Sequence, residues 1–254
     1  MISCICVLYL ALLPPGGLAL LPPAGHAQSC GVRLQPDSDP DVLYAKREDP
    51  ASARQSAAIW AERLQRNPKD FESAWKLARA RYWLGGHGPD AERRTALETG
   101  ITAGRAAVAL QPNRPEGHFW IAANMGALAE SFGLRQGLKY RGAIKDELLT
   151  VLRLDPAFQQ GSADRALGRW YSKVPGLFGG SDKKSEEHLR KSLTYNPNSP
   201  ASLFFLAEIL IDLKRKPEAR AALENVIAAP LDPGWAPEDR DFKLQAQRLL
   251  AQIR

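Results

Sequence analysis

The sequence predicts an all-α protein in which helical hairpins stack into a solenoid. Apolar helical patterns end in a proline at intervals of 44, 44, 41 and 33 residues, at Pro68, Pro112, Pro156, Pro197 and Pro230. Such intervals are typical of helix-turn-helix arrays, whose units bury their apolar faces against their neighbours. In the last unit, large and small apolar residues occupy the positions at which tetratricopeptide repeats (TPRs) interlock: Leu203, Leu206, Ala207, Leu210, Ala219, Leu223 and Val226. We therefore expect a TPR-like helical-hairpin solenoid.

The stretch 117–158 is the clearest hairpin. Ile121, Met125, Leu128 and Phe132 recur at helical spacing, and Tyr140, Ile144, Leu148 and Val151 repeat that spacing in the second half. The small residues Ala123, Gly126 and Ala127 give the first helix a slim side. The second helix ends at Asp155, because a residue before proline is disfavoured in the α region.

The earlier units follow the same plan. The first full helix is expected over 51–66, after the Asp49-Pro50 start signal, and the next begins near Phe71. Glycine-rich segments at 85–89, 133–137 and 175–180 are expected to join the two helices of successive units. Since stacked units share one orientation, these turns are predicted to lie along one edge of the solenoid.

Composition predicts a leader followed by one domain. Residues 1–27 contain an interrupted apolar run and end in the small-residue pattern Gly25-His26-Ala27, which favours a secretory signal peptide, although no Lys or Arg precedes Arg33. Residues 28–50 are rich in proline and aspartate and are expected to be a linker. The helical repeat domain then covers 51–254, and no later apolar run approaches the length of a membrane span. We expect a periplasmic or secreted protein.

The cysteines leave one question open. Cys4 and Cys6 would be removed with the leader, so Cys30 would stand alone. It is either an inert residue of the linker or a lipid attachment site, which would make the anchor the protein's only contact with a membrane. The residues before it, Ala27-Gln28-Ser29, lack the aliphatic side chain usual for lipidation.

Charge and motifs argue against several functions. The net charge of +6 is spread through helices among acidic residues, which indicates a solvated surface and not a nucleic-acid interface. The histidines have no partners at metal-ligand spacing, so no metal or other cofactor is predicted. No nucleophile elbow or phosphate loop is present, and we expect no enzyme activity.

Aromatic residues offer the best candidates for a ligand site. Trp75 and Tyr82 share a helix face and are expected to be core. Trp83, Trp120 and Tyr171, with Asn124 as a polar handle, are predicted to line a pocket next to the small residues of the central helix. The alternative, that those small residues only admit a neighbouring helix and the aromatics fill the core, stays open.

Particular segments resemble a known family. WKLARARYWLG (75–85), HFWIAANMGALAE (118–130), IKDELLTVLRLDP (144–156), LGRWYSKVPG (167–176) and HLRKSLTYNPN (188–198) resemble the T-component of TRAP transporters. The same order of motifs is similar to the regulator of microtubule dynamics proteins. The resemblance covers about residues 50–235 of the chain.

The resemblance implies a TPR-like periplasmic protein, often lipid-anchored and able to form a homotrimer. It also implies a partner, the solute-binding protein of a TRAP transporter, and a cavity suited to an apolar ligand. We therefore predict a non-enzymatic transporter accessory that binds this partner and an apolar or organic-acid ligand. The alternative is a TPR scaffold for protein–protein assembly in the cell envelope.

Overall fold

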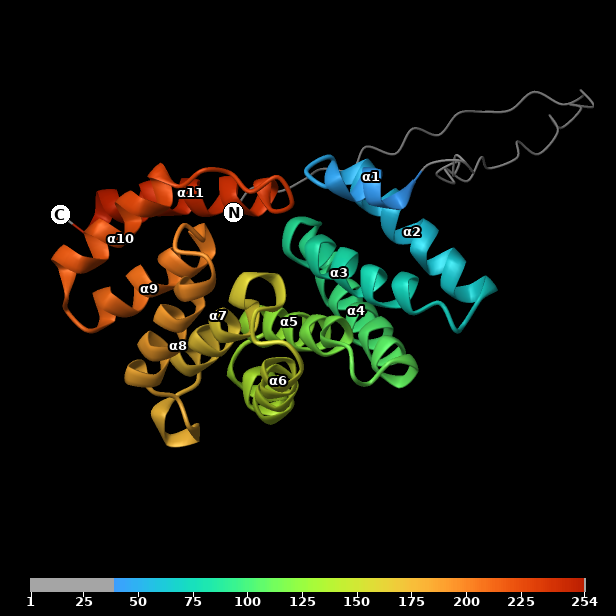
Figure 1. Ribbon diagram of the computed structural model, residues 1–254, viewed down its shortest axis with the longest axis horizontal. Helices are drawn as coiled ribbons and strands as arrows, with labels where there is room; N and C mark the ends of the chain where they lie inside the picture. Colours follow the sequence, from blue (N-terminus) through green and yellow to red (C-terminus); the bar gives the residue numbers. More distant parts are fainter. Residues whose placement is uncertain (1–38, 254) are drawn as a thin grey trace, which may run out of the picture. The chain divides into compact units, whose positions relative to one another are not determined.

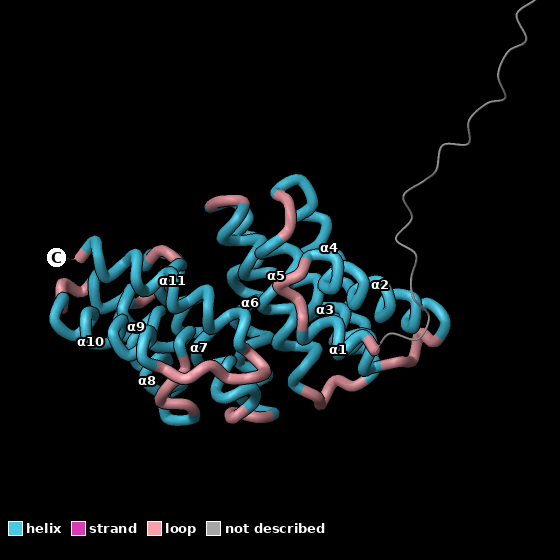
Figure 2. Tube along the Cα trace, turned by 90° about the horizontal axis from the view of Figure 1, so that it is seen from above, coloured by secondary structure: helices cyan, strands magenta, loops and turns pink. Residues whose placement is uncertain are grey.

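The computed structural model describes residues 39–253, which form eleven α-helices and one short 3-10 helix (Figure 1). The helices are α1 Pro40–Ala45, α2 Pro50–Arg66, α3 Phe71–His87, α4 Asp90–Leu110, α5 Pro115–Ser131, α6 Leu134–Leu154, α7 Phe158–Lys173, α8 Asp182–Tyr195, α9 Pro200–Asp212, α10 Lys216–Ala228 and α11 Ala236–Gln252, with the 3-10 helix at Gly176–Phe178. Figure 2 shows these helices joined by short loops, and residues 39–253 contain no strand. The predicted all-α fold is confirmed.

The helices pair in the predicted order. α3 packs on α4, α5 on α6, α7 on α8 and α9 on α10, and α4–α5 and α8–α9 contacts join successive hairpins. The five prolines of the repeat pattern each lie just beyond a helix end, after α2, α4, α6, α8 and α10. Each proline thus ends the second helix of a hairpin, as the spacing predicted. The structure is a TPR-like solenoid.

Two large hydrophobic clusters hold the hairpins together, beside a small one around Phe71, Ala74 and Ala107. The larger one runs from α1 through α7 and includes Trp60, Leu97, Ile121 and Leu148, all nearly inaccessible to solvent. The other joins α8 to α11 around Leu210 and Leu223. Every helix contributes one apolar stripe to such a cluster, which is the arrangement expected when amphipathic helices stack.

The boundary of the helical domain differs from the prediction. The expected linker, 28–50, contains helix α1, in which Asp39 caps the backbone N–H of Asp41 and Pro40 occupies the first turn. Proline suits that position because its fixed φ is helical and it needs no N–H partner there. The linker prediction is therefore wrong over residues 40–45. The predicted leader, Cys30 and Arg254 lie outside the described residues.

Within residues 39–253, no helix combines the length and apolar character needed to cross a bilayer. α11 instead turns back from the last hairpin, and its first turn meets the region of α1 (Figure 1). The segment after α1 is thus in contact with the start of the last helix.

Candidate functional site

A cavity of about 1000 Å³ opens among α5, α6, α7, α9 and the start of α11. Cavities that take small-molecule ligands are commonly about 300–1,000 Å³. This cavity is large enough for a ligand with several rings or a long alkyl chain. Its walls are mostly apolar but also carry eight charged side chains, among them Arg141, Arg165 and Arg169.

The slim side of α5 forms one wall of the cavity. Ala123, Gly126 and Ala127 all line it, and a Cβ atom added at Gly126 would meet no atom within 4 Å. A helix packed here would have placed atoms against Gly126. Gly126 therefore leaves space on this surface, while Ala123 and Ala127 both line the cavity and pack against the larger hydrophobic cluster.

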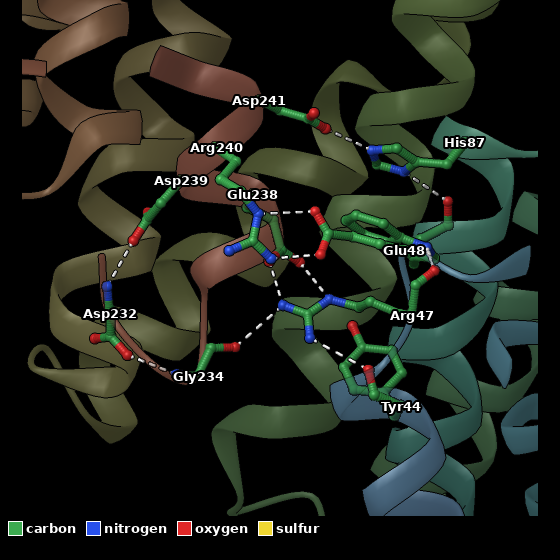
Figure 3. A network of polar contacts seen from close by, with 11 residues as sticks. Tyr44, Arg47, Glu48, His87, Asp232, Gly234, Glu238, Asp239, Arg240 and Asp241 are labelled. Carbon is green, nitrogen blue, oxygen red and sulfur yellow. Dashed lines mark hydrogen bonds and ion pairs between the residues drawn. The ribbon is translucent and has the colours of Figure 1, made fainter. Parts of the chain in front are cut away.

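A network of charged side chains, which we call the clasp, joins the segment after α1 to the start of α11 (Figure 3). Its centre is Arg47, whose Nε donates to Glu238 Oε1 at 3.0 Å, while Nη2 donates to the carbonyl of Gly234 at 3.1 Å and Nη1 to that of Tyr44 at 3.3 Å. Arg47 is only 3% exposed, so its charge is satisfied almost entirely by protein atoms. The indole N–H of Trp83 in turn donates to the Arg47 carbonyl at 2.8 Å.

The outer part of the clasp is exposed to solvent. Arg240 Nε donates to Glu48 Oε1 at 2.9 Å, and His87 Nε2 lies 2.9 Å from Asp241 Oδ2. Glu238 and Asp239, which follow each other at the start of α11, also line the cavity. The start of α11, which carries the inner part of the clasp, therefore forms part of the cavity wall.

Burial raises the pKa of Glu238, and the hydrogen bond and charge of Arg47 only partly offset this effect. The pKa of Asp239 is also raised by burial, against the hydrogen bond that it accepts from the Asp232 amide. In contrast, the hydrogen bond from Arg240 lowers the pKa of Glu48. The pKa values of Glu238 and Asp239, in the inner half of the clasp, are thus raised, whereas that of Glu48, in the outer half, is lowered.

Arg165 of α7 lines the cavity without a partner. It makes no hydrogen bond and no ion pair with any residue in 39–253, and its side chain is half-buried. Burial lowers its pKa, and the nearby Tyr82, Asp239 and Glu238 only partly offset this effect. Arg169, one turn later, differs: burial opposes its charge, but bonds to Glu130 and Glu208 outweigh this and raise its pKa.

Two further hydrogen-bond donors in the cavity wall have no acceptor among the described residues. One is the Tyr82 hydroxyl, and the other is the indole N–H of Trp120, which is buried. The two rings lie 5.6 Å apart between centroids. Tyr82 is 37% exposed and lines the cavity, so the expectation that it belongs to the core is wrong.

The start of α7 carries backbone strain beside the same cavity. Gln159, Gln160 and Gly161 have φ angles of 45°, 59° and 75°, so the regular right-handed helix begins only at Ser162. Left-handed conformation costs a non-glycine residue about 1–2 kcal/mol, and such strain tends to occur at functional sites. The turn places both glutamines in the cavity wall, where Gln160 Nε2 donates to Asp232 Oδ2 at 2.8 Å.

The structure does not bring the predicted ligand-binding residues together. Of the four, only Trp120 lines the cavity. Trp83 stacks on His87 with ring centroids 3.5 Å apart and supports the clasp. Asn124 is fully buried and its amide donates to the carbonyls of Ala78 at 3.1 Å and Trp120 at 2.7 Å, so it joins α5 to α3. Tyr171 stacks on His188 at 5.4 Å.

The prediction about the glycine-rich turns holds in part. Gly133 and Gly137 after α5, and Pro175 after α7, line the cavity. Gly85 and Gly86 lie inside α3, and Gly88 borders a separate, smaller pocket. The first turn is therefore not part of the site, because α3 continues through the two glycines.

The sequence did not predict that Arg165 and Tyr82 line the cavity. Arg165 sits in a stretch, ADRALGR, whose charges are typical of a solvated helix face. Nothing local marks it as enclosed, because the enclosure depends on α11 and on contacts between residues 191 positions apart. Among residues 39–253, no cluster of three or more His, Cys, Asp or Glu side chains could hold a metal ion.

The fold places the protein among TPR-like solenoids. The chain is similar to a thermophilic TPR protein of Thermus thermophilus, with 21% identity, a TM-score of 0.63, and coverage of 84% of this chain and 97% of the other. It is also similar to PilF of Pseudomonas aeruginosa, with 16% identity, a TM-score of 0.53, and coverage of 84% and 89%. At these identities the likeness shows the fold alone. A comparison with curated protein sequences found no match.

Matches to two family models assign the chain to its families. Residues 117–252 match the TRAP transporter T-component, and residues 39–177 match Regulator of microtubule dynamics protein 1-3. Each match spans more than half of the 254 residues, so the chain belongs to the T-component family and also to the regulator of microtubule dynamics family. The resemblance found in the sequence is confirmed. Membership and fold support an accessory or scaffold role.

Proposed function

We propose that this protein is a non-enzymatic accessory of a TRAP-type solute transporter, which binds the transporter's solute-binding protein and holds a small ligand with an apolar body in its cavity. It would act in the periplasm after removal of the leader, with or without a lipid on Cys30. The observation that carries the proposal is the cavity of about 1000 Å³ in a member of the T-component family. The clasp would hold the start of α11 in the cavity wall while a ligand is bound.

The partner half of the proposal has a direct test. The mature chain is mixed with each TRAP solute-binding protein of the same host, and the mixture is analysed by size-exclusion chromatography with light scattering. We expect a complex with at least one of them. A periplasmic solute-binding protein of the ABC-transporter class serves as the control and should elute separately. Failure of every TRAP solute-binding protein to bind would overturn this half and leave the envelope scaffold as the alternative.

The ligand half is tested by filling the cavity. Gly126→Leu places a side chain into open space at the cavity wall, so the variant should fold and lose room for a ligand. Gly142→Leu is the matched control, because Gly142 is also helical and open but exposed and outside the cavity. The neutral fluorophore N-phenyl-1-naphthylamine should bind the wild type and Gly142→Leu, and bind Gly126→Leu much more weakly. Equal binding of the fluorophore to the two variants would contradict the ligand half of the proposal.

A further inference from the structure

Three hydrogen-bond donors without acceptors among the described residues meet at the same cavity. They are the Arg165 guanidinium, the Tyr82 hydroxyl and the Trp120 indole N–H. The Tyr82 and Trp120 rings are 5.6 Å apart, and Tyr82 is close enough to Arg165 for the two to affect each other's ionisation. Of the three, only the Trp120 indole N–H is fully buried, and a buried donor in a folded protein is nearly always satisfied. Arg165 is half-buried and Tyr82 is exposed, so a ligand in the cavity can reach both of them.

Residues 39–253 do not supply an acceptor for Arg165. Glu238 and Asp239 face Arg165 from α11, but neither comes within ion-pair distance of it, and Glu238 is bonded to Arg47. Glu130 on α5 is bonded to Arg169 at 3.0 Å. Asp239 accepts the Asp232 amide at 2.9 Å. Each of these carboxylates therefore accepts a hydrogen bond from another residue, and the Arg165 guanidinium remains available to a ligand.

We propose that Arg165, with Tyr82 and Trp120, binds the carboxylate of an amphipathic organic acid whose apolar part lies along Ala123, Gly126 and the neighbouring cavity wall. A guanidinium can hold both oxygens of a carboxylate through parallel N–H bonds, which gives geometric as well as energetic selectivity. The apolar wall gains from covering an alkyl or aryl body. The inference rests on the proposed ligand-binding function and deepens it by naming the ligand class.

The test compares three probes that share one ten-carbon chain and differ only in the head group. Decanoate, decan-1-ol and decylamine each compete with N-phenyl-1-naphthylamine for the wild-type protein. We expect decanoate to compete about ten- to a hundred-fold better than decan-1-ol, which is the range for hydrogen bonds with a charged partner. Decylamine should compete least, because it would meet Arg165 with a like charge. If decan-1-ol or decylamine equals decanoate, the carboxylate assignment is overturned.

Variants then locate the head group. Arg165→Gln should remove the advantage of decanoate over decan-1-ol and leave decan-1-ol binding nearly unchanged, and Tyr82→Phe should reduce the advantage by a smaller factor. Arg141→Gln is the matched control, because Arg141 lines the same cavity and has no ion pair within residues 39–253 but donates to the Leu138 carbonyl at 3.2 Å. It should retain the decanoate preference. An unchanged preference in Arg165→Gln, or an equal loss in both arginine variants, would contradict the assignment.

The outcomes separate this inference from the proposed function. If the fluorophore binds the wild type but decanoate has no advantage, the cavity stands as a ligand site and the role of Arg165 fails. If the fluorophore does not bind at all, the ligand half of the proposed function fails first. Should Arg165→Gln not fold, Arg165→Lys provides the second variant, since it keeps the charge and loses the two-pronged geometry. A decanoate preference in Arg165→Lys equal to that of the wild type would overturn the carboxylate geometry.

Discussion

Arg47 is buried and Arg165 is half-buried, and the two arginines differ in what surrounds them. Arg47 donates to Glu238, to two carbonyl oxygens, and lies over the Tyr44 ring at 4.7 Å. Arg165 makes no hydrogen bond or ion pair within residues 39–253. A buried charge that is fully paired holds structure together, whereas one left unpaired costs free energy. We attribute a stabilising role to the clasp, and under the proposal above the Arg165 guanidinium stays available for a ligand.

The largest effect is expected from breaking the clasp. Arg47→Met leaves Glu238 in a mostly buried position without its partner, so the free energy of unfolding should fall by about 3 kcal/mol. Urea unfolding followed by circular dichroism measures this change. Adding Glu238→Met to Arg47→Met should recover a large part of the loss, because the uncompensated charge is gone. A loss below about 1 kcal/mol in Arg47→Met would mean that the clasp does not hold the ends together.

A smaller effect is expected from pH. Because the folded-state pKa of Glu238 is raised above its unfolded value, the folded protein binds more protons than the unfolded chain between those two values. Stability should therefore fall as pH rises through that window, and Asp239, whose pKa is also raised by burial, adds to the fall. Glu238→Gln should flatten the dependence, although its baseline stability is lower. Urea midpoints measured at a series of pH values provide the readout.

The control for this pH dependence is Glu48→Gln. The hydrogen bond from Arg240 lowers the pKa of Glu48, so its contribution is present above the ordinary value and is lost as pH falls through the folded value. Removing it should leave the decline with rising pH intact. If Glu48→Gln flattens that decline and Glu238→Gln does not, the assignment of the inner and outer halves is reversed.

The smallest effect is expected at the exposed half of the clasp. Arg240→Gln removes a bond with Glu48 in which both side chains face solvent. Ion pairs of this kind contribute little, because water already solvates the charges and the side chains lose freedom on pairing. The urea midpoint should stay within experimental error of the wild type. A shift as large as that of Arg47→Met would show that closure depends on the outer pair.

The sequence predicted the helices well because their signals are local. Proline positions, apolar spacing and the slim side of α5 each depend on residues within a turn or two of one another, and the structure confirms them. The cavity wall at Ala123, Gly126 and Ala127 was therefore predictable, and so was the presence of Trp120 beside it.

The rest of the site depends on contacts that local patterns do not contain. Trp83 looked like a cavity residue because it stands near a glycine-rich segment, yet α3 continues through Gly85 and Gly86 and turns Trp83 toward Arg47. Tyr82 looked like core because it follows the apolar spacing, but the space beside α5 leaves it open to the cavity. Arg165 lines the same cavity as the start of α11, and the sequence around Arg165 does not contain that long-range arrangement.

Within residues 39–253, Arg47 is paired with groups of the protein and Arg165 is not. The most direct test of this division compares the urea unfolding of two matched variants, Arg47→Gln and Arg165→Gln, with and without decanoate. Without ligand, Arg47→Gln should lose stability and Arg165→Gln should match or exceed the wild type, because an uncompensated charge is removed. With decanoate, the wild type and Arg47→Gln should gain stability and Arg165→Gln should gain almost none, since a ligand stabilises only a folded state that binds it. Equal destabilisation of both variants, with an equal gain from decanoate, would contradict the division.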